Sequence, residues 1–454
     1  MQAADRIPAT FTDLYELTMA AVYWAGQMND PATFELAVRE LPPSRGYLVM
    51  CGVESTLEFL EQVRFDEPAL AYLASLDLFE EPFLAMLETL RFTGDVWAIP
   101  EGEVAFAGEP LVRVTAPLIE AQLVETFLLN AVSYETMIAT NAARISQACA
   151  GREWVDFSAR RNHGIDASVR AARVARIGGA AGTSLVLAGQ EFGLGLSGTM
   201  AHSFVMRFGD ERDAFLSFAR AFPGRAVILL DTYDTDDAAS LLAELAEQLR
   251  AEGALPRGVR LDSGDLDSLS RSVRATLDRA GLGDLQILAS GDLDEYRIEQ
   301  LVAAGAPVDG FGVGTHLVAG PGAQLDAAYK LVEDATGPKL KLSPGKASLP
   351  GRKQVYRISD GDHCAYDVLA LHDEVVAEGR PLLDQVMTNG TRTSAPETLE
   401  AAAKRREIAV SGLPSRTVAL EPLPPPYEVR LTPALRTLRD RLRASHTRVV
   451  GTTP

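Results

Sequence analysis

The feature that most constrains the fold is an alternation of short apolar runs and helical segments that begins near Glu153. The runs EWVDF, AVILLD, GVRLD, LQILA and VDGFGVG each lead into a short polar or glycine-bearing segment, and a helical pattern follows. Asp231 and Asp262 close two successive runs, and the interval between them matches one βα unit of about 30 residues. This alternation predicts a parallel α/β sheet, with a barrel favoured over an open, doubly wound sheet.

Composition excludes several classes of protein. The chain has 454 residues, of which 47% are hydrophobic and 23% charged, as expected for a globular protein of two or three domains. A formal net charge of −19 argues against nucleic acid and anionic membranes as partners. No apolar run approaches the ~18 residues of a membrane span. The start of the chain does not read as a secretory signal, and the three scattered cysteines form no zinc or disulfide pattern. We therefore expect a cytoplasmic protein.

Several polar residues follow the apolar runs, where α/β folds place their active sites. Arg260 and Asp262 lie two residues apart on a predicted strand end, so their side chains point to the same face. They would suit a substrate with an acidic group and a sugar, although a structural ion pair explains them equally well. Arg160 and Arg161 could clamp an anion and Phe157 could stack on a flat ring. The alternative is that the arginines are solvated and Phe157 is part of the core.

His202 and two glycine turns are further candidates. His202 lies among small and hydroxyl residues in SGTMAHSFV and could accept a proton or a phosphoryl group, although a lone histidine is more often structural. The turns GDLD (291–294) and GVGTH (312–316) could bind phosphate through backbone N–H groups. The lysines that follow could add charge for a pyrophosphate; they are Lys330, Lys341 and Lys346. No P-loop motif occurs, so any use of ATP does not involve a P-loop.

Taken together, these segments resemble the nicotinate phosphoribosyltransferase family over residues 10 to 356. The resemblance rests on TDLYELT, FELAVRELPPSRGYLV, EGEVAFAGEPLVRV, DFSARR, GTMAHSFV, LLDTYDT, GVRLDSGDL, FGVGTHL and AYKLVE, in this order. It implies an irregular TIM-like α/β barrel over residues 121–345. An N-terminal α/β domain (1–120) precedes the barrel, and a C-terminal extension (346–454) packs on that domain.

The resemblance also implies a reaction. Nicotinate, phosphoribosyl pyrophosphate, ATP and water give nicotinate mononucleotide, pyrophosphate, ADP and phosphate, with Mg²⁺, in NAD salvage. The enzyme would be a homodimer with shared active sites. His202 would be phosphorylated, and it would be catalytic with Asp231 and Asp262. The implied base-site residues are Tyr15 (from the neighbouring subunit), Phe157, Arg160, Ser184, Thr199 and Arg260. The implied phosphate and pyrophosphate residues are Arg39, Gly291, Gly314, Thr315, Lys330 and Lys341.

Two positions refine these expectations. The related nicotinamide enzyme carries an aspartate at the position of Ser184, and an aspartate there would repel the carboxylate of nicotinic acid. Ser184 therefore favours the acid as substrate. Ser158 stands where the family usually has glycine, and it would cost ~1 kcal/mol if the backbone there needs a positive φ.

The competing functions are a nicotinamide phosphoribosyltransferase of the same fold, a sugar-phosphate lyase or isomerase on a barrel, and a non-catalytic binding protein.

Overall fold

The computed structural model describes residues 7–42, 44–320, 325–343 and 347–450, and the side chains of these residues up to 445. Lys346 lies outside the described residues. The chain forms two compact units, Met1–Thr140 with Gln324–Pro454, and Asn141–Ala323. Helix α6 (Glu125–Ala148) carries the chain from one unit to the other. Within the described ranges, the apolar length of every helix falls short of what a membrane crossing requires.

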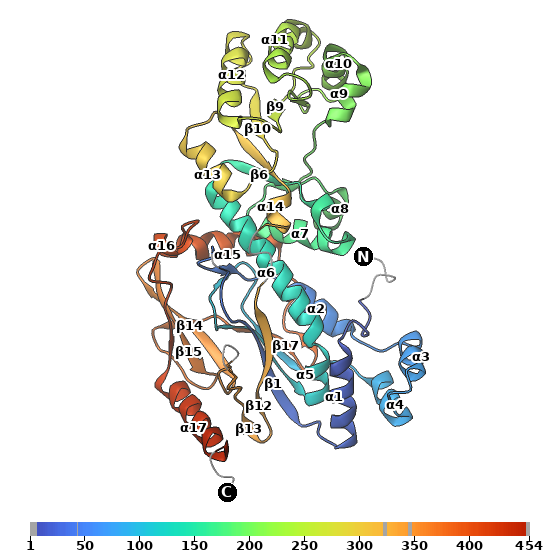
Figure 1. The fold of residues 1–454 in the computed structure, drawn as a ribbon, viewed down its shortest axis with the longest axis vertical. Helices are drawn as coiled ribbons and strands as arrows, with labels where there is room; N and C mark the ends of the chain where they lie inside the picture. Colours follow the sequence, from blue (N-terminus) through green and yellow to red (C-terminus); the bar gives the residue numbers. More distant parts are fainter. Residues whose placement is uncertain (1–6, 43, 321–324, 344–346, 451–454) are drawn as a thin grey trace. The chain divides into compact units, whose positions relative to one another are not determined.

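The unit Asn141–Ala323 contains a six-stranded sheet in the order β7-β6-β11-β10-β9-β8, in which every neighbouring pair is parallel (Figure 1). Its strands are β6 (Glu153–Asp156), β7 (Gly182–Thr183), β8 (Val227–Leu229), β9 (Gly258–Leu261), β10 (Gln286–Ala289) and β11 (Gly310–Val313). Its helices are η1 (Ala159–Arg161), α7 (Ile165–Ile177), α8 (Val186–Phe192), α9 (His202–Phe208), α10 (Glu211–Ala221), α11 (Thr235–Ala251), α12 (Leu266–Arg279), α13 (Glu295–Ala303) and α14 (Thr315–Val318). The predicted alternation of parallel strands and helices is confirmed.

Three of the helices that follow strands of this sheet begin at aspartates. The side chains of Asp234, Asp265 and Asp294 accept hydrogen bonds from backbone N–H groups in the first turns of α11, α12 and α13. Such capping satisfies donors that a helix start otherwise leaves unpaired. Helices α10, α11 and α12 then pack against one another in chain order (Figure 1). Helices α11, α12 and α13 each begin a few residues after the carboxyl end of the preceding strand. The short loops between these strands and helices can therefore carry functional residues.

The prediction of a TIM-like barrel is only partly met. Beyond β7, the sheet continues through a single parallel bridge between Thr183 and Leu196. Among the described residues, no pairing joins this edge to β8 at the other edge, so the sheet is not a closed barrel. The sheet nevertheless curls. This is seen from the cavity lining, to which residues 195–199 at one edge of the sheet and Val227 at the other edge both belong. Strand β7 has only two residues, so it offers too few backbone N–H and C=O groups to pair with a further strand and close a regular barrel.

The unit Met1–Thr140 with Gln324–Pro454 is built on an antiparallel sheet in the order β13-β12-β1-β5-β3-β17-β18. Its strands are β1 (Pro31–Val38), β3 (Asp95–Ala98), β5 (Pro110–Pro117), β12 (Ala327–Asp334), β13 (Gly337–Pro338), β17 (Asp384–Thr388) and β18 (Thr391–Arg392). Smaller sheets contain β2 (Leu48–Val49), β4 (Val104–Ala105), β14 (Lys353–Asp360), β15 (His363–Leu371), β16 (Gly379–Pro381) and β19 (Val429–Leu431). Strands from both ends of the chain thus share one sheet.

The remaining helices belong to this unit. They are α1 (Leu14–Ala25), α2 (Val53–Gln62), α3 (Glu67–Ser75), α4 (Glu81–Thr89), α5 (Leu118–Leu123), α15 (Leu399–Ser411), α16 (Ser415–Val418) and α17 (Pro433–Val450). Helix α5 packs on β1 and β5 and also contacts α1 (Figure 1). Buried ion pairs add to the apolar core, since Arg357 lies 2.6 Å from Asp367 and 2.7 Å from Glu103. The three-part domain division at residues 120 and 345 stays a prediction.

Candidate functional site

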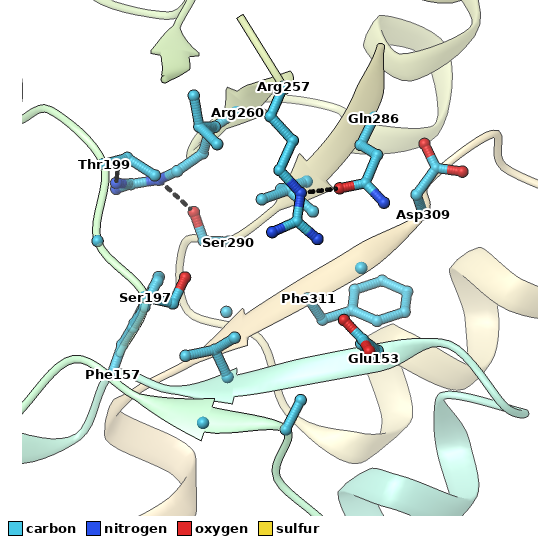
Figure 2. A pocket seen from close by; sticks show the side chains of 18 of the residues that line it. Glu153, Phe157, Ser197, Thr199, Arg257, Arg260, Gln286, Ser290, Asp309 and Phe311 are labelled. Carbon is cyan, nitrogen blue, oxygen red and sulfur yellow. Dashed lines mark hydrogen bonds between the residues drawn. The ribbon is translucent and has the colours of Figure 1, made fainter. Parts of the chain in front are cut away.

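A cavity of about 540 Å³ lies inside the curled parallel sheet (Figure 2). All the strands of the sheet and the segment 195–199 contribute to its lining. At the carboxyl ends of the strands the lining includes Phe157, Thr199, Arg260 and Ser290, and at the amino ends it includes Glu153, Arg257, Gln286 and Asp309. The predicted residues Phe157, Thr199 and Arg260 therefore meet in one place, at the end of the sheet where α/β folds bind ligands.

Arg260, on β9, is the most constrained of the lining side chains. Its guanidinium donates to Ser290 Oγ at 2.9 Å and to Thr199 Oγ1 at 2.5 Å, and it lies 3.0 Å from Asp262 Oδ1. The guanidinium carbon is 5.9 Å from the centre of the Phe157 ring. Arg260 and Asp262 share a face as predicted and form an ion pair, whereas their role in holding substrate stays a prediction. Because Arg260 also lines the cavity, a positive charge is fixed in advance beside an aromatic ring.

Asp262 links this arginine to His202. Asp262 Oδ1 accepts the Ser290 hydroxyl at 2.5 Å, and Asp262 Oδ2 lies 3.8 Å from His202 Nε2. Burial acts to raise the pKa of Asp262, but the Ser290 hydrogen bond and the Arg260 charge outweigh it and hold the pKa below its ordinary value. The carboxylate is therefore ionised at neutral pH. The other ring nitrogen, Nδ1, lies 3.3 Å from Thr232 Oγ1, so both nitrogens of His202 face polar partners.

Asp231 lies next to this group. One of its oxygens, Oδ2, accepts the backbone N–H of Asp262 at 3.1 Å and the hydroxyl of Ser263 at 2.5 Å. The other, Oδ1, is buried and has no hydrogen-bond partner among the described residues. A buried carboxylate oxygen is costly without a partner. It is thus available to a ligand group or a cation at this end of the sheet.

Ser184 is an exposed residue that directly follows β7, as Phe157 directly follows β6. Asp156 pairs in register with Thr183, and the Ser184 N–H donates to the Asp156 carbonyl at 2.9 Å. Phe157 and Ser184 each follow these paired residues. The pairing places Ser184 at the same end of the sheet as Phe157, but Ser184 does not line the cavity, and its role at the base site stays a prediction. Burial raises the pKa of Asp156, although hydrogen bonds from Ser158 and Thr183 lower it.

The concern about Ser158 is resolved, because its φ is −83° and ψ −15°. This is ordinary right-handed backbone that any residue adopts, so no glycine is needed and the cost of ~1 kcal/mol does not arise. Ser158 is buried and its N–H donates to Asp156 Oδ1 at 2.8 Å. Arg160 and Arg161, in η1, are exposed and do not line the cavity. Their predicted anion-binding role stays a prediction.

The two glycine turns also lie at the carboxyl ends of strands. Gly291 has φ +90°, and a Cβ there would lie 1.7 Å from the Asp262 carbonyl oxygen. A Cβ on Gly312 would lie 2.5 Å from the Phe157 ring, and one on Gly314 would lie 3.2 Å from the Phe157 carbonyl oxygen. Only glycine allows such close approach at Gly291 and Gly312. Thr315 begins α14 directly after Gly314.

The remaining predicted residues belong to the other unit. Arg39 and Lys330 line a second cavity of about 320 Å³, whereas Lys341 is exposed and does not line it. Arg39 Nη1 lies 2.5 Å from Asp326 Oδ1, and Lys330 Nζ lies 3.7 Å from Glu125 Oε1. Tyr15, on α1, is 47% exposed. Burial, with nearby carboxylates such as Glu125, raises the pKa of its phenol, so Tyr15 is a neutral aromatic surface.

Glu16, the neighbour of Tyr15, is fully buried. Its Oε1 accepts the N–H of Thr126 at 3.1 Å and the hydroxyl of Thr126 at 2.7 Å, and its Oε2 accepts the Thr12 hydroxyl. Burial raises the pKa of Glu16 to about 7, although the Thr12 and Thr126 hydrogen bonds act to lower it. This side chain therefore anchors α1 to the start of α6.

We expect Glu16 to make stability depend on pH. A carboxyl whose pKa is raised by folding favours the folded state at low pH, and this advantage is lost as the pH rises through about 7. Glu16→Gln carries no such charge. The Tm of Glu16→Gln minus that of the unsubstituted protein should therefore be more positive at pH 8 than at pH 5. A difference that stays constant over this range would show that Glu16 does not titrate in it.

Sequence reasoning missed four residues of this site, namely Ser290, Thr232, Asp156 and Thr183. Ser290 directly follows the run LQILA, and Thr232 directly follows Asp231, which closes the run AVILLD. A rule that takes every polar residue after a run would have included them. The pairing of Asp156 with Thr183 depends on which strands are neighbours in the sheet, and the order along the chain does not reveal this.

Comparison with known proteins identifies the family. The N-terminal domain model of nicotinate phosphoribosyltransferase matches residues 10–133, and the model of the nicotinate phosphoribosyltransferase family matches residues 153–340. A nicotinate phosphoribosyltransferase of Mycobacterium tuberculosis is 47% identical over 98% of this chain and 96% of the relative. One from Bacillus subtilis is 42% identical over 82% of this chain and 78% of the relative.

Solved structures agree with this result. Human nicotinic acid phosphoribosyltransferase superposes with a TM-score of 0.82 at 28% identity, and the match covers 95% of this chain and 99% of the human one. A nicotinate-nucleotide pyrophosphorylase from Pyrococcus furiosus superposes with a TM-score of 0.73 at 25% identity, over 89% and 95% of the two chains. Sequence and structure together show that this chain belongs to the nicotinate phosphoribosyltransferase family.

Proposed function

We propose that this protein joins nicotinic acid to phosphoribosyl pyrophosphate and gives nicotinate mononucleotide and pyrophosphate, with hydrolysis of ATP to ADP and phosphate. The observation that carries the proposal is the cavity in which Arg260 is fixed beside the Phe157 ring, with Asp262 and His202 adjoining it. The names of the relatives support the same base and the same transfer. NAD salvage is the pathway that such a product enters.

The base site follows from charge and shape. The pyridine ring would stack on Phe157, and Arg260 would attract the carboxylate, with Thr199 fixing Arg260. Ser184, which follows β7 at the same end of the sheet as Phe157, adds no negative charge. A nicotinamide enzyme is the nearest alternative, and a fixed arginine favours the acid over the neutral amide. A sugar-phosphate lyase or isomerase is disfavoured, because it would commonly need a lysine or glutamate at this end of the cavity, where Arg260 and Ser290 lie instead.

His202 would carry the phosphoryl group. A ring nitrogen attacks the γ-phosphorus of ATP, the bond from that phosphorus to the bridging oxygen breaks, and ADP leaves with the electron pair. Water later hydrolyses the phosphohistidine to phosphate and so completes the reaction. Thr232 and Asp262 lie on opposite sides of the imidazole and support its orientation.

Transfer to the base requires the bond between C1 of the ribose and the pyrophosphate to break. This leaves a cationic sugar, which Asp231 and Asp262 could stabilise, and an anionic leaving group. Mg²⁺ would arrive with ATP and phosphoribosyl pyrophosphate as part of the substrate complexes and neutralise phosphate charge. The residues fit this use, since Asp231 Oδ1 is buried without a partner among the described residues. No group of three or more His, Cys, Asp or Glu side chains suited to a resident metal occurs within the described ranges.

The remaining roles complete the proposal. Gly291, Gly314 and Thr315 would hold the 5′-phosphate, while Arg39, Lys330 and Lys341 would approach the pyrophosphate, and Arg160 would contact base or ribose. Tyr15 would stack on the base from the neighbouring subunit of a homodimer in the cytoplasm. The curl of the parallel sheet supports an irregular barrel over residues 121–345, flanked by the N-terminal domain and the C-terminal extension.

Subunit mixing tests the function and the shared site together. Unsubstituted protein should form nicotinate mononucleotide, whereas Tyr15→Ala and His202→Ala should each form little. Heterodimers of the two variants contain one intact composite site if Tyr15 acts across the interface, so mixing under subunit exchange should restore part of the activity. Demonstrated heterodimers that recover no activity would show that Tyr15 and His202 act in the same subunit.

A further inference from the structure

A contact between two side chains joins the two glycine-bearing loops of the unit Asn141–Ala323. His316 Nε2 lies 3.0 Å from Asp292 Oδ1. Asp292 lies in the loop after β10, and His316 lies in the first turn of α14, after β11. Strands β10 and β11 are parallel neighbours, so both loops leave the same edge of the sheet. We propose that this pair, the His316–Asp292 clasp, positions both loops for the 5′-phosphate of the mononucleotide. The inference rests on the proposed function of these loops.

The backbone at Asp292 is unusual and needs support. Gly291 has φ +90° and Asp292 has φ +52°, so two successive residues are left-handed. Glycine adopts this conformation freely, whereas a residue with a Cβ pays for it. The carbonyl of Asp292 accepts a hydrogen bond from Arg297 Nη1 at 3.1 Å, and this holds the loop from within its own βα unit. His316 provides the contact from the other loop, and it holds the Asp292 side chain.

The helices behind the loops are fixed independently by α6. Arg144 Nε donates to Glu295 Oε1 at 3.1 Å, at the start of α13, and Asn141 Nδ2 donates to the Leu317 carbonyl at 3.1 Å, within α14. Arg144, Glu295 and Asn141 are all buried. Loss of the clasp should therefore leave α13 and α14 in place and affect only the spacing of the loop N–H groups. This separates a positioning role from a general role in folding.

The clasp also changes the charge that a phosphate would meet. The Asp292 carboxylate is 70% exposed, and a free carboxylate beside a phosphate is repulsive. An imidazole N–H that donates to Oδ1 engages this carboxylate and directs it toward His316. The predicted effect is specific, since it concerns the phosphate end of the ligand and leaves the base end at Phe157 unaffected.

Two ligands that differ only by the 5′-phosphate test the clasp on the full-length protein. Calorimetric titration should show that the unsubstituted protein binds nicotinate mononucleotide more tightly than nicotinate riboside. His316→Ala should raise the Kd for the mononucleotide roughly three- to tenfold and leave the Kd for the riboside unchanged. His316→Gln keeps an N–H donor and Asp292→Asn keeps an acceptor oxygen, so both should stay within about twofold of the unsubstituted protein.

The outcomes distinguish the clasp from the proposed function. If the unsubstituted protein prefers the mononucleotide and His316→Ala keeps the full preference, the proposed role of the clasp is wrong. The proposal that the two loops hold the 5′-phosphate would then be unaffected. An equal loss for both ligands in His316→Ala, without rescue in His316→Gln, would also overturn the clasp, because it indicates a general structural defect. If the unsubstituted protein binds both ligands equally, the loops do not hold the phosphate and both proposals fail.

Discussion

Replacement of His202 by alanine is expected to abolish labelling of the protein by γ-labelled ATP and to remove the stimulation of mononucleotide formation by ATP. The reason is that His202 is the only residue near Asp262 and Thr232 proposed to accept a phosphoryl group. Alanine removes the imidazole that would accept the phosphoryl group, while the proposed base site of Phe157 and Arg260 is unchanged. Residual, ATP-independent formation of the mononucleotide should therefore remain. Phosphohistidine is acid-labile, so the label must be measured without acid.

A matched control for this experiment is His163→Ala, since His163 is an exposed histidine in the same unit. It should take up the label as the unsubstituted protein does. Labelling of His202→Ala at the unsubstituted level would place the phosphoryl group on another residue. A loss of label in both variants would point to a fault in folding, which thermal melting would reveal.

Substitution of Ser184 by aspartate should move the base preference from nicotinic acid toward nicotinamide. Ser184 follows β7 at the same end of the sheet as Phe157, and in the proposed base site a carboxylate there would lie near the carboxylate of the bound acid. Two such charges ~4 Å apart repel by about 4 kcal/mol at an effective dielectric constant of ~20. Ser184 is exposed, and solvent screens part of this repulsion. We therefore expect the ratio of kcat/KM for acid over amide to fall roughly 100-fold, at ~1.4 kcal/mol per tenfold.

Ser184→Asn is the matched control, because asparagine has the size of aspartate without its charge. It should change the ratio of the two kcat/KM values far less than Ser184→Asp does, even if both variants lose activity. An unchanged ratio in Ser184→Asp would mean that Ser184 does not face the carboxylate. In that case the selectivity would rest with Arg260 alone, and Arg260→Lys, which cannot reproduce the planar contacts to Ser290 and Thr199, should alter it.

The spacing of apolar and polar residues along the sequence was sufficient to predict the alternating strands and helices and one contact in the candidate site. Alternation along a strand placed Arg260 and Asp262 on one face, and they form an ion pair at 3.0 Å. The stretch from Thr93 to Pro117 is rich in Val, Gly and Pro at short spacing, which predicts short strands with tight turns, and it forms β3, β4 and β5. These features are local, since they depend on spacing within one element and on the turns that bound it.

Features that depend on strand order could not be predicted in this way. The approach of His202 to Asp262 requires α9 to lie beside β9, and these elements are separated by two helices and a strand along the chain. The curl of the sheet, which forms the cavity, depends on how Leu196 bridges to Thr183. The backbone angles of Ser158 could not be predicted from the sequence either, because a glycine at the same position in the family does not always adopt a positive φ.

The most direct test of the account is formation of nicotinate mononucleotide by the purified full-length protein. The protein would be incubated with Mg²⁺ and phosphoribosyl pyrophosphate, with either nicotinic acid or nicotinamide, and with or without ATP. We predict that nicotinic acid gives the mononucleotide, that ATP increases its formation and is hydrolysed to ADP, and that nicotinamide is a poor substrate. A protein that forms product only from nicotinamide, or forms none from nicotinic acid with ATP present, would contradict the account.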